Sequence, residues 1–193
     1  MDGRYFTNPL QFLVETLFGF YILLVMLRFF LQRVRADFYN PLSQMLVRLT
    51  DPALRPLRRR IPGYWWVDWA AVLLMWLLQS LALLLVMLLL GLGLQPLMAM
   101  GLALPKLVVL AINVFIFAIV IDAIFSWISP GQYNPLAALS RSLAYPLLRP
   151  VRRFLPPIAG VDLSPMAAII GLVMLEMLVV PLLDTLTRAP RFL

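Results

Sequence analysis

Four long apolar stretches, separated by shorter polar and basic segments, dominate the pattern of this chain. They cover approximately residues 10–31, 67–92, 107–128 and 163–183. A helix needs roughly 20 apolar residues to cross the hydrocarbon core of a bilayer, and each stretch reaches that length. The 193 residues are 63% hydrophobic and only 13% charged, which is typical of membrane proteins. The pattern therefore predicts an all-α integral membrane protein with four transmembrane helices.

The sequence repeats itself without a gap. Tyr-Asn-Pro-Leu at residues 39–42 returns at residues 133–136, a shift of 133 − 39 = 94. At the same shift, Pro-x-Leu-Arg-Pro-x-Arg-Arg at residues 52–59 returns at residues 146–153, which indicates a duplication. Each copy contains two spans, so both copies enter the membrane in the same direction, and their repeat axis lies along the membrane normal. The two tandem units are expected to cover residues 1–98 and 99–193.

A short amphipathic helix is expected between the two spans of each unit, over about residues 41–50 and 135–144. Asparagine followed by proline begins each helix, and these residue types suit the N-cap and the first helical position. Apolar residues then recur at helical spacing, which predicts helices lying in the plane of the membrane interface. These residues are Leu42, Met45, Leu46 and Leu49 in the first copy and Leu136, Leu139 and Leu143 in the second.

Prolines are expected to shape the segment after each amphipathic helix. Pro52 and Pro146 are predicted to end the two helices, because proline lacks the N–H that a helix interior requires. Two further prolines in each copy are predicted to hold the nearby arginines on an extended or turning backbone. They are Pro56 and Pro62 in the first copy and Pro150 and Pro156 in the second.

The basic residues give the chain a predicted orientation. Its formal charge is +7, and eleven of its sixteen cations lie in the two connectors that carry the amphipathic helices. The positive-inside rule places these connectors in the cytoplasm, and both termini and residues 93–106 outside. The sequence thus predicts a multi-pass protein of the bacterial inner membrane, with the first span kept as an uncleaved signal-anchor. The eleven cations are Arg33, Arg35, Arg48, Arg55, Arg58, Arg59, Arg60, Arg141, Arg149, Arg152 and Arg153.

The arginines of the repeated motif are candidate binding residues. A guanidinium group pairs with phosphate through two parallel hydrogen bonds, and each cation near an anionic surface contributes on the order of 1 kcal/mol. One interpretation is a topology determinant that anchors to anionic phospholipid, and another is recognition of a membrane or cytoplasmic protein. Nucleic acid is not an expected partner, since no base-stacking aromatic residue interrupts the arginine clusters. The candidates are Arg55, Arg58, Arg59, Arg149, Arg152 and Arg153.

Acidic residues at the start of the second span of each unit suggest helix caps. Asp68 and Asp162 stand at equivalent positions there. A carboxylate at a helix N-terminus accepts hydrogen bonds from free backbone N–H groups and is favoured by the helix dipole. Both carboxylates can also pair with the arginines just upstream. A proton-carrying role is the alternative.

Charged residues within the spans need partners, because a charge at the bilayer centre costs roughly 2.5–3.5 kcal/mol. Arg28 and Asp122 are equivalent in the two units, since 122 − 28 = 94. They are therefore predicted to pair across the interface between the first and third spans. Glu15 and Glu176 could bind a cation together or extend separately toward the outer interface.

The composition excludes several kinds of chemistry. The chain has no Cys and no His, which excludes disulfides, thiol nucleophiles, imidazole bases and the usual zinc or haem ligands. No nucleophile–base pair and no phosphate-loop or dinucleotide fingerprint is visible. The sequence therefore predicts a protein that is not an enzyme and that has no cofactor and no metal site.

The repeated motif resembles that of the YggT family of bacterial membrane proteins, whose relatives are also called YlmG. Its arginine-proline segment and the following Val-Asp occur at residues 52–68 and 146–162, and Phe-Ser-Trp-Ile at residues 125–128 resembles a further family element. The first copy departs from the pattern, with Gln-Arg at residues 32–33 where the second has Ser-Trp. The resemblance implies links to cell division, envelope organisation or osmotic tolerance, without a set of catalytic residues.

Two functions are compatible with these features. The first is a non-enzymatic scaffold or assembly factor in cell division, envelope organisation or membrane-complex biogenesis, which docks through its cytoplasmic arginine-proline segments. The second is a small ion or osmolyte transporter, motivated by Glu15, Arg28, Asp122 and Glu176 at membrane depth. Four spans make a small pore, so the transporter would have to act as a homo-oligomer.

Overall fold

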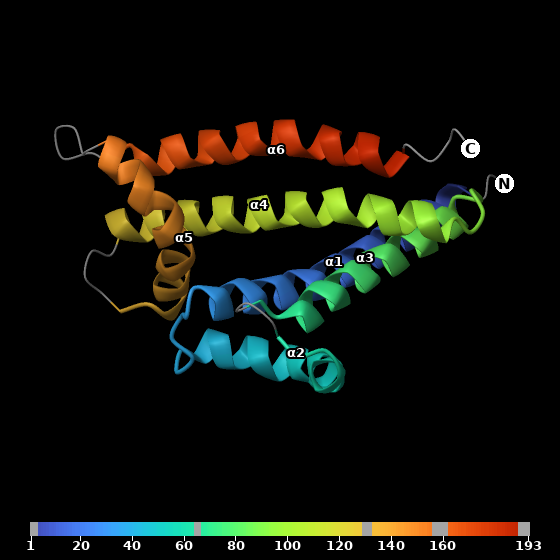
Figure 1. Cartoon of the computed structure of the whole chain (residues 1–193), viewed down its shortest axis with the longest axis horizontal. Coiled ribbons are helices and arrows are strands. Elements are labelled where there is room, and N and C mark those ends of the chain that lie inside the picture. Colours follow the sequence, from blue (N-terminus) through green and yellow to red (C-terminus); the bar gives the residue numbers. More distant parts are fainter. Residues whose placement is uncertain (1–3, 64–66, 129–132, 156–161, 189–193) are drawn as a thin grey trace.

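In the residues that it describes, the computed structural model contains six helices, which Figure 1 shows in sequence colours. They are α1 (Arg4–Arg33), α2 (Pro41–Arg60), α3 (Trp69–Leu89), α4 (Pro96–Ile128), α5 (Pro135–Phe154) and α6 (Ser164–Arg188). The structure describes residues 4–63, 67–128, 133–155 and 162–188. Within these ranges it contains helices and connecting turns and no β-sheet, as the sequence predicts.

Four of the helices are long and apolar enough to cross a membrane: α1, α3, α4 and α6. This confirms the predicted all-α architecture with four spans. One boundary differs, because α4 begins at Pro96 and includes most of residues 93–106, which were expected to form a connector. Pro105 lies buried within α4. The expected boundary between the units, after residue 98, therefore falls within the first turn of this helix.

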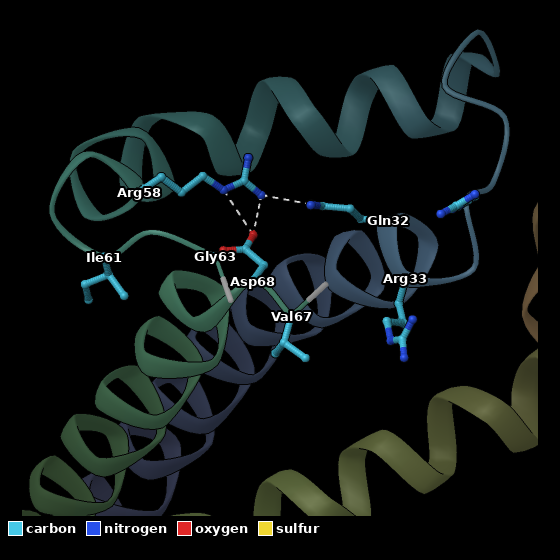
Figure 2. Close-up of a pocket in the computed structure, with 8 residues that line it drawn as sticks. Gln32, Arg33, Arg58, Ile61, Gly63, Val67 and Asp68 are labelled. Atoms are coloured by element: carbon cyan, nitrogen blue, oxygen red, sulfur yellow. Dashed lines mark hydrogen bonds and ion pairs between the residues drawn. The ribbon is translucent and has the colours of Figure 1, made fainter. Parts of the chain in front are cut away.

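The amphipathic helices α2 and α5 are longer than predicted, at 20 residues each. The expectation that Pro52 and Pro146 end them is wrong, since both helices continue through two prolines. The physical reason is that these prolines lie on the exposed side of the helix, where water can reach the carbonyl groups that lose their partners. Figures 1 and 2 show α2 bending toward its C-terminal end, as helices do at proline. Pro156 and Val161, in the second copy of the motif, lie outside the described residues.

The two units bury the same face of their amphipathic helix. The buried positions on α2 are Ser43, Leu46, Thr50 and Leu54. Each has a buried counterpart on α5 at a shift of 94 residues: Ala137, Ser140, Ala144 and Leu148. On α2 this stripe is shifted from the predicted one, because Met45 and Leu49 are exposed, whereas Leu139 and Leu143 of α5 are buried as predicted. The duplication is therefore visible in the packing as well as in the sequence.

Leu54 and Leu148 hold the C-terminal halves of the two amphipathic helices against the spans. Both are almost completely buried, at 0% and 1% exposure. Leu54 packs against α1 and α3 in one apolar cluster, and Leu148 packs against α4 and α6 in another. Burial of a leucine side chain contributes about 1.5–3 kcal/mol, which explains how packing can retain a helix that contains two prolines.

The units meet along α4, which packs against α3 on one side and against α5 and α6 on the other. Asn40, 1% exposed, caps α2 and also donates from Nδ2 to the carbonyl oxygen of Pro135 at the start of α5 (2.7 Å). Both amphipathic helices lie at one end of the bundle, which is called the basic end below. The start of α1 and the end of α6 lie at the other end (Figure 1).

Candidate functional site

An ion pair joins the end of α2 to the start of α3 at the basic end (Figure 2). Arg58 donates to the Oδ2 atom of Asp68 from Nε (3.0 Å) and from Nη2, and Nη2 also donates to Oε1 of Gln32 on α1 (3.0 Å). Asp68 caps α3, since its Oδ1 accepts the backbone N–H of Ala71 (3.3 Å). Its side chain is only 8% exposed. Arg58 and Asp68 thus connect three helices of the first unit.

The second unit repeats this arrangement. Arg152 donates from Nε to Oδ2 of Asp162 (3.0 Å), and both residues stand 94 positions after Arg58 and Asp68. Oδ1 of Asp162 accepts the backbone N–H of Ser164 at the start of α6 (2.9 Å). Burial tends to raise the pKa of Asp162, but hydrogen bonds from Ser164 and Arg152 outweigh it and lower the pKa. We call these two arrangements the Arg–Asp clamps.

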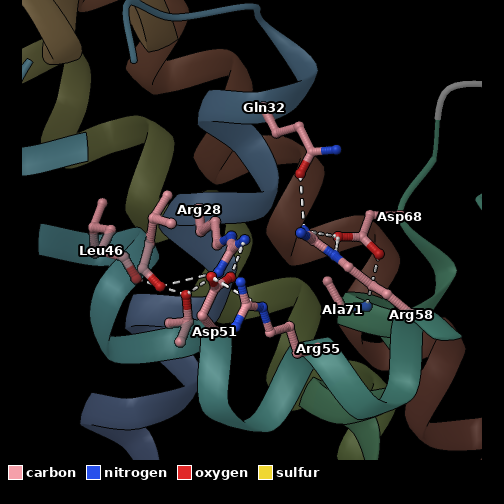
Figure 3. Close-up of polar contacts among 10 residues, drawn as sticks. Arg28, Gln32, Leu46, Asp51, Arg55, Arg58, Asp68 and Ala71 are labelled. Atoms are coloured by element: carbon pink, nitrogen blue, oxygen red, sulfur yellow. Dashed lines mark hydrogen bonds and ion pairs between the residues drawn. The ribbon is translucent and has the colours of Figure 1, made fainter. Parts of the chain in front are cut away.

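A second ion pair ties α1 to the middle of α2 (Figure 3). Arg28 is 7% exposed and lies 2.7 Å from Asp51 through Nη2 and Oδ1. Its Nη1 also donates to Oγ1 of Thr50 (2.8 Å) and to the carbonyl oxygen of Val47 (3.3 Å). The hydrogen bond from Arg28 is the main reason that the pKa of Asp51 lies below its usual value.

The equivalent pair in the second unit has reversed polarity. Asp122 on α4, 8% exposed, accepts from Nε of Arg141 on α5 (3.3 Å). The span therefore supplies the cation in the first unit and the anion in the second. The predicted Arg28–Asp122 pair is wrong, because each residue pairs with the amphipathic helix of its own unit. The prediction relied on the equivalent depth of Arg28 and Asp122 in the membrane. The nearer partner of Arg28 is Asp51, the only acidic residue of α2.

The clamps divide the predicted arginine cluster into two parts. Arg58 and Arg152 pair with the capping carboxylates Asp68 and Asp162, although the side chain of Arg152 is itself 43% exposed. The other four candidates are exposed and do not contact these caps. These four occur as pairs four residues apart, so each pair shares one helix face. Arg55 lies 4.0 Å from Asp51 with 78% of its side chain exposed, and the other three form no ion pair within the described ranges. We call these residues the outer arginine row: Arg55, Arg59, Arg149 and Arg153.

A cavity of about 580 Å³ lies toward the end of the bundle opposite the basic end, between α1, α3, α4 and α6. Its polar lining residues are Glu15, Gln79, Lys106, Asn113 and Asp184. Glu176 is not part of this lining, so the structure does not bring Glu15 and Glu176 together here. No cluster of three or more acidic residues suited to a metal ion occurs among residues that the structure describes.

Comparison with known proteins identifies the family. The model of the CCB3/YggT family matches the chain twice, at residues 7–89 and 101–183. The chain belongs to the CCB3/YggT family. The two matched segments start 101 − 7 = 94 residues apart, which is the shift of the repeat. No solved structure matches the chain.

Members of the CCB3/YggT family from several bacteria resemble the chain over most of their length. Protein PA0392 of Pseudomonas aeruginosa is 44% identical over 182 residues, which cover 93% of this chain and 92% of the relative. A Vibrio alginolyticus protein from the proC 3′ region is 40% identical, covering 86% of this chain and 90% of the relative. YggT of Escherichia coli K12 is 36% identical, covering 88% of each chain. The shared architecture is therefore that of a multi-pass membrane protein with two tandem repeats.

Proposed function

We propose that the protein is a non-enzymatic scaffold or assembly factor of the bacterial inner membrane. It docks through the outer arginine row on anionic phospholipid and on a membrane or cytoplasmic protein involved in envelope organisation or cell division. The observation that carries the proposal is the division of the arginine motif. Arg58 and Arg152 are bound to the capping carboxylates of the clamps, while the other four arginines of the motif are exposed in matching positions and do not contact these caps.

The chemistry of the row supports docking rather than catalysis. Exposed guanidinium groups spaced four residues apart on a helix can pair with successive phosphates or carboxylates. The clamps attach each helix to the next span, and Leu54 and Leu148 bury its inner face. The row is thereby held on a fixed helix, so little backbone freedom has to be lost when a partner binds.

Photo-crosslinking in living cells tests this proposal. A benzoylphenylalanine residue replaces Arg60 in one strain and Phe154 in another, two exposed positions related by the repeat, since 154 − 60 = 94. We expect capture of the same discrete protein at both positions. Neutralising the outer row (Arg55→Gln, Arg59→Gln, Arg149→Gln and Arg153→Gln) should reduce capture at least about tenfold, because each charge-assisted contact is worth about 1.5–3 kcal/mol.

Two controls make the crosslinking result specific. Arg48→Gln removes an exposed cation of α2 outside the row and should leave capture unchanged. A crosslinker at Met177, a 72% exposed position on span α6, should capture other species. The scaffold proposal fails if the neutralised variant captures the same protein as efficiently as the unmodified chain.

The orientation proposed for the chain is testable with single cysteines, since the sequence has none of its own. Leu94→Cys lies between α3 and α4 at 69% exposure, and Gln44→Cys lies on the exposed side of α2. We expect a membrane-impermeant maleimide to label Leu94→Cys in intact spheroplasts and Gln44→Cys only after the membrane is opened. Labelling in the opposite order would place the basic end outside.

A second candidate function, transport of a small cation, is favoured by the cavity of about 580 Å³. Two carboxylates and one ammonium group line it, giving a net charge of −1 from Glu15, Asp184 and Lys106. Purified protein in liposomes should then take up radioactive Rb⁺, and Glu15→Gln should reduce uptake at least fivefold. The matched control Glu176→Gln, outside the lining, should not. Absence of uptake by the unmodified protein would remove this candidate.

A further inference from the structure

A cavity at the basic end of the first unit is lined by three arginines. It measures about 780 Å³ and lies between the end of α1, the end of α2 and the start of α3. Arg33 and Arg35 come from the end of α1, and Arg58 from α2. The lining residues also include Gln32 and one acid, Asp68. Three cations against one anion give the lining a net charge of +2.

The single anion of the lining is already engaged. Asp68 accepts two hydrogen bonds from Arg58 and one from the backbone of Ala71. Arg58 in turn uses Nε and Nη2 for these contacts, so that Nη1 remains as a donor, and Gln32 accepts through Oε1, so that its Nε2 amide remains as a donor. Figure 2 shows Arg58 extending toward Gln32, with Arg33 pointing to another side of α1. The groups that Arg58 and Gln32 leave for a ligand are therefore donors, which suit an anion.

The backbone at Arg35 provides an independent indication. The residue has φ = 53°, in the left-handed region, and it is the only residue other than glycine with positive φ in the described ranges. Ala36 N–H donates to the carbonyl of Leu31 (2.9 Å) and Arg35 N–H donates to that of Gln32 (3.3 Å). These bonds form a Schellman motif that ends α1, with Arg35 at the position where glycine is preferred.

The end of α3 shows the same motif with the preferred residue. Leu92 N–H donates to the carbonyl of Met87 (3.0 Å) and Gly91 N–H donates to that of Leu88 (3.1 Å). Gly91 has φ = 70° there. An arginine at the corresponding place in α1 is less favourable for folding than glycine, because its Cβ atom crowds the backbone in this conformation. Strain of this kind indicates that the Arg35 side chain has a use of its own.

The second unit lacks these cations. The positions 94 residues after Arg33 and Arg35 are Trp127 and Ser129, neither of which is a cation. The clamp is present in both units, so the clamp does not require the additional arginines. Their presence in the first unit alone points to a role that the two units do not share.

We propose that this cavity binds a phosphate group, with Arg35 and Arg58 as its direct contacts and Arg33 raising the local positive potential. The phosphate is that of an anionic phospholipid or of a soluble phosphate compound. The cavity lies where span α1 ends, which is the depth at which headgroup phosphates are found. This inference does not rest on the proposed scaffold function, because Arg33 and Arg35 are not part of the outer arginine row.

Substitution of Arg35 by glycine tests the proposal without endangering the fold. Binding of phosphatidylglycerol to the purified, delipidated chain is measured by native mass spectrometry, and binding of inorganic phosphate by the shift in Tm. Arg35→Gly should raise the Tm of the unliganded protein, because the left-handed conformation no longer carries a Cβ atom. It should weaken the binding of the phosphate-bearing ligand about tenfold, through loss of a charge-assisted contact.

Arg48→Gln, which removes an exposed cation outside both the cavity lining and the outer arginine row, is the matched control and should bind as the unmodified chain does. Weakened binding of the lipid alone identifies a headgroup as the source of the phosphate, and weakened binding of inorganic phosphate identifies a soluble compound. The proposal is overturned if Arg35→Gly raises the Tm and binds both ligands normally. It is also overturned if Arg48→Gln weakens binding equally, since the effect would then be one of total charge.

Discussion

Arg28→Asp destabilises the protein by about 3–5 kcal/mol, and Asp51→Arg in the same chain restores most of this loss. The expected loss is large because Arg28 is 7% exposed and its reversal leaves two carboxylates facing each other with little water. The double variant re-forms the ion pair with opposite polarity, which is the polarity that Asp122 and Arg141 already have at the equivalent place. Unfolding by sodium dodecyl sulfate in mixed micelles, followed by tryptophan fluorescence, measures the free energies.

The second unit supplies the control for this prediction. Asp122→Arg should behave as Arg28→Asp does, and Arg141→Asp should compensate for it. If Arg28→Asp is instead rescued by Asp122→Arg, the two spans pair with each other and the arrangement described here is incorrect. If neither partner rescues, the loss comes from packing of the arginine stem rather than from its charge.

The pH dependence of stability provides a second test of the ion pair between Arg28 and Asp51. Since the hydrogen bond from Arg28 lowers the pKa of Asp51, the folded state binds the proton more weakly than the unfolded state does. The contribution of Asp51 to stability is therefore present above its ordinary pKa of 3.8 and is lost as the pH falls through the lower pKa of the folded state. Asp51→Asn should make the free energy of unfolding depend less on pH in this acidic range.

The reversed polarity also specifies which amphipathic helix belongs to which span. Were α5 to occupy the place of α2, Arg141 would take the position of Val47, whose carbonyl now contacts Arg28, since 141 − 47 = 94. Two cations would then meet in a site with little water. Like charges in such surroundings are unfavourable by several kcal/mol. The opposite polarity of the two ion pairs thus discriminates electrostatically between α2 and α5, which are nearly equivalent in the repeat.

The number of spans and the tandem repeat could be predicted because they depend on long patterns. Apolar stretches of about 20 residues and a gapless shift of 94 residues leave little freedom in the architecture. The lengths of α2 and α5 could not be predicted in the same way. Local rules end a helix at Pro52, but burial of Leu54 two residues later retains it. Tertiary packing outweighs a local preference here.

The candidate site was predicted in its residue types and only partly in its contacts. The motif predicts the six arginines as binding residues and Asp68 and Asp162 as helix caps. The sequence does not show which of the arginines pair with these caps. Only the direction of each side chain separates the clamp residues from the outer arginine row. Arg28 and Asp122 were singled out correctly as charges that need partners, whereas the choice of partner depended on the rotation of α2 and α5 about their axes. This rotation is set by the packing of the helices in three dimensions, so it cannot be predicted directly from the sequence.

Asp68→Ala destabilises the protein more than Asp162→Ala does, although the two residues are equivalent in the repeat. Asp68 caps α3 and receives two hydrogen bonds from Arg58, and its side chain is 8% exposed. Loss of the cap and of a poorly hydrated ion pair amounts to about 2–4 kcal/mol. The side chain of Asp162 is 33% exposed, so water replaces much of what Arg152 contributes, and about 1 kcal/mol is expected.

A double-mutant cycle separates the two roles of Asp68. Asp68→Asn keeps an oxygen that can accept the N–H of Ala71 but removes the charge, so it should lose less than Asp68→Ala. In an Arg58→Ala background the remaining cost of Asp68→Ala should fall to that of the cap, about 1 kcal/mol. Equal losses at Asp68 and Asp162 in micelle unfolding would show that burial does not set the strength of the clamps. Full additivity of the Arg58 and Asp68 substitutions would show that the two residues do not interact.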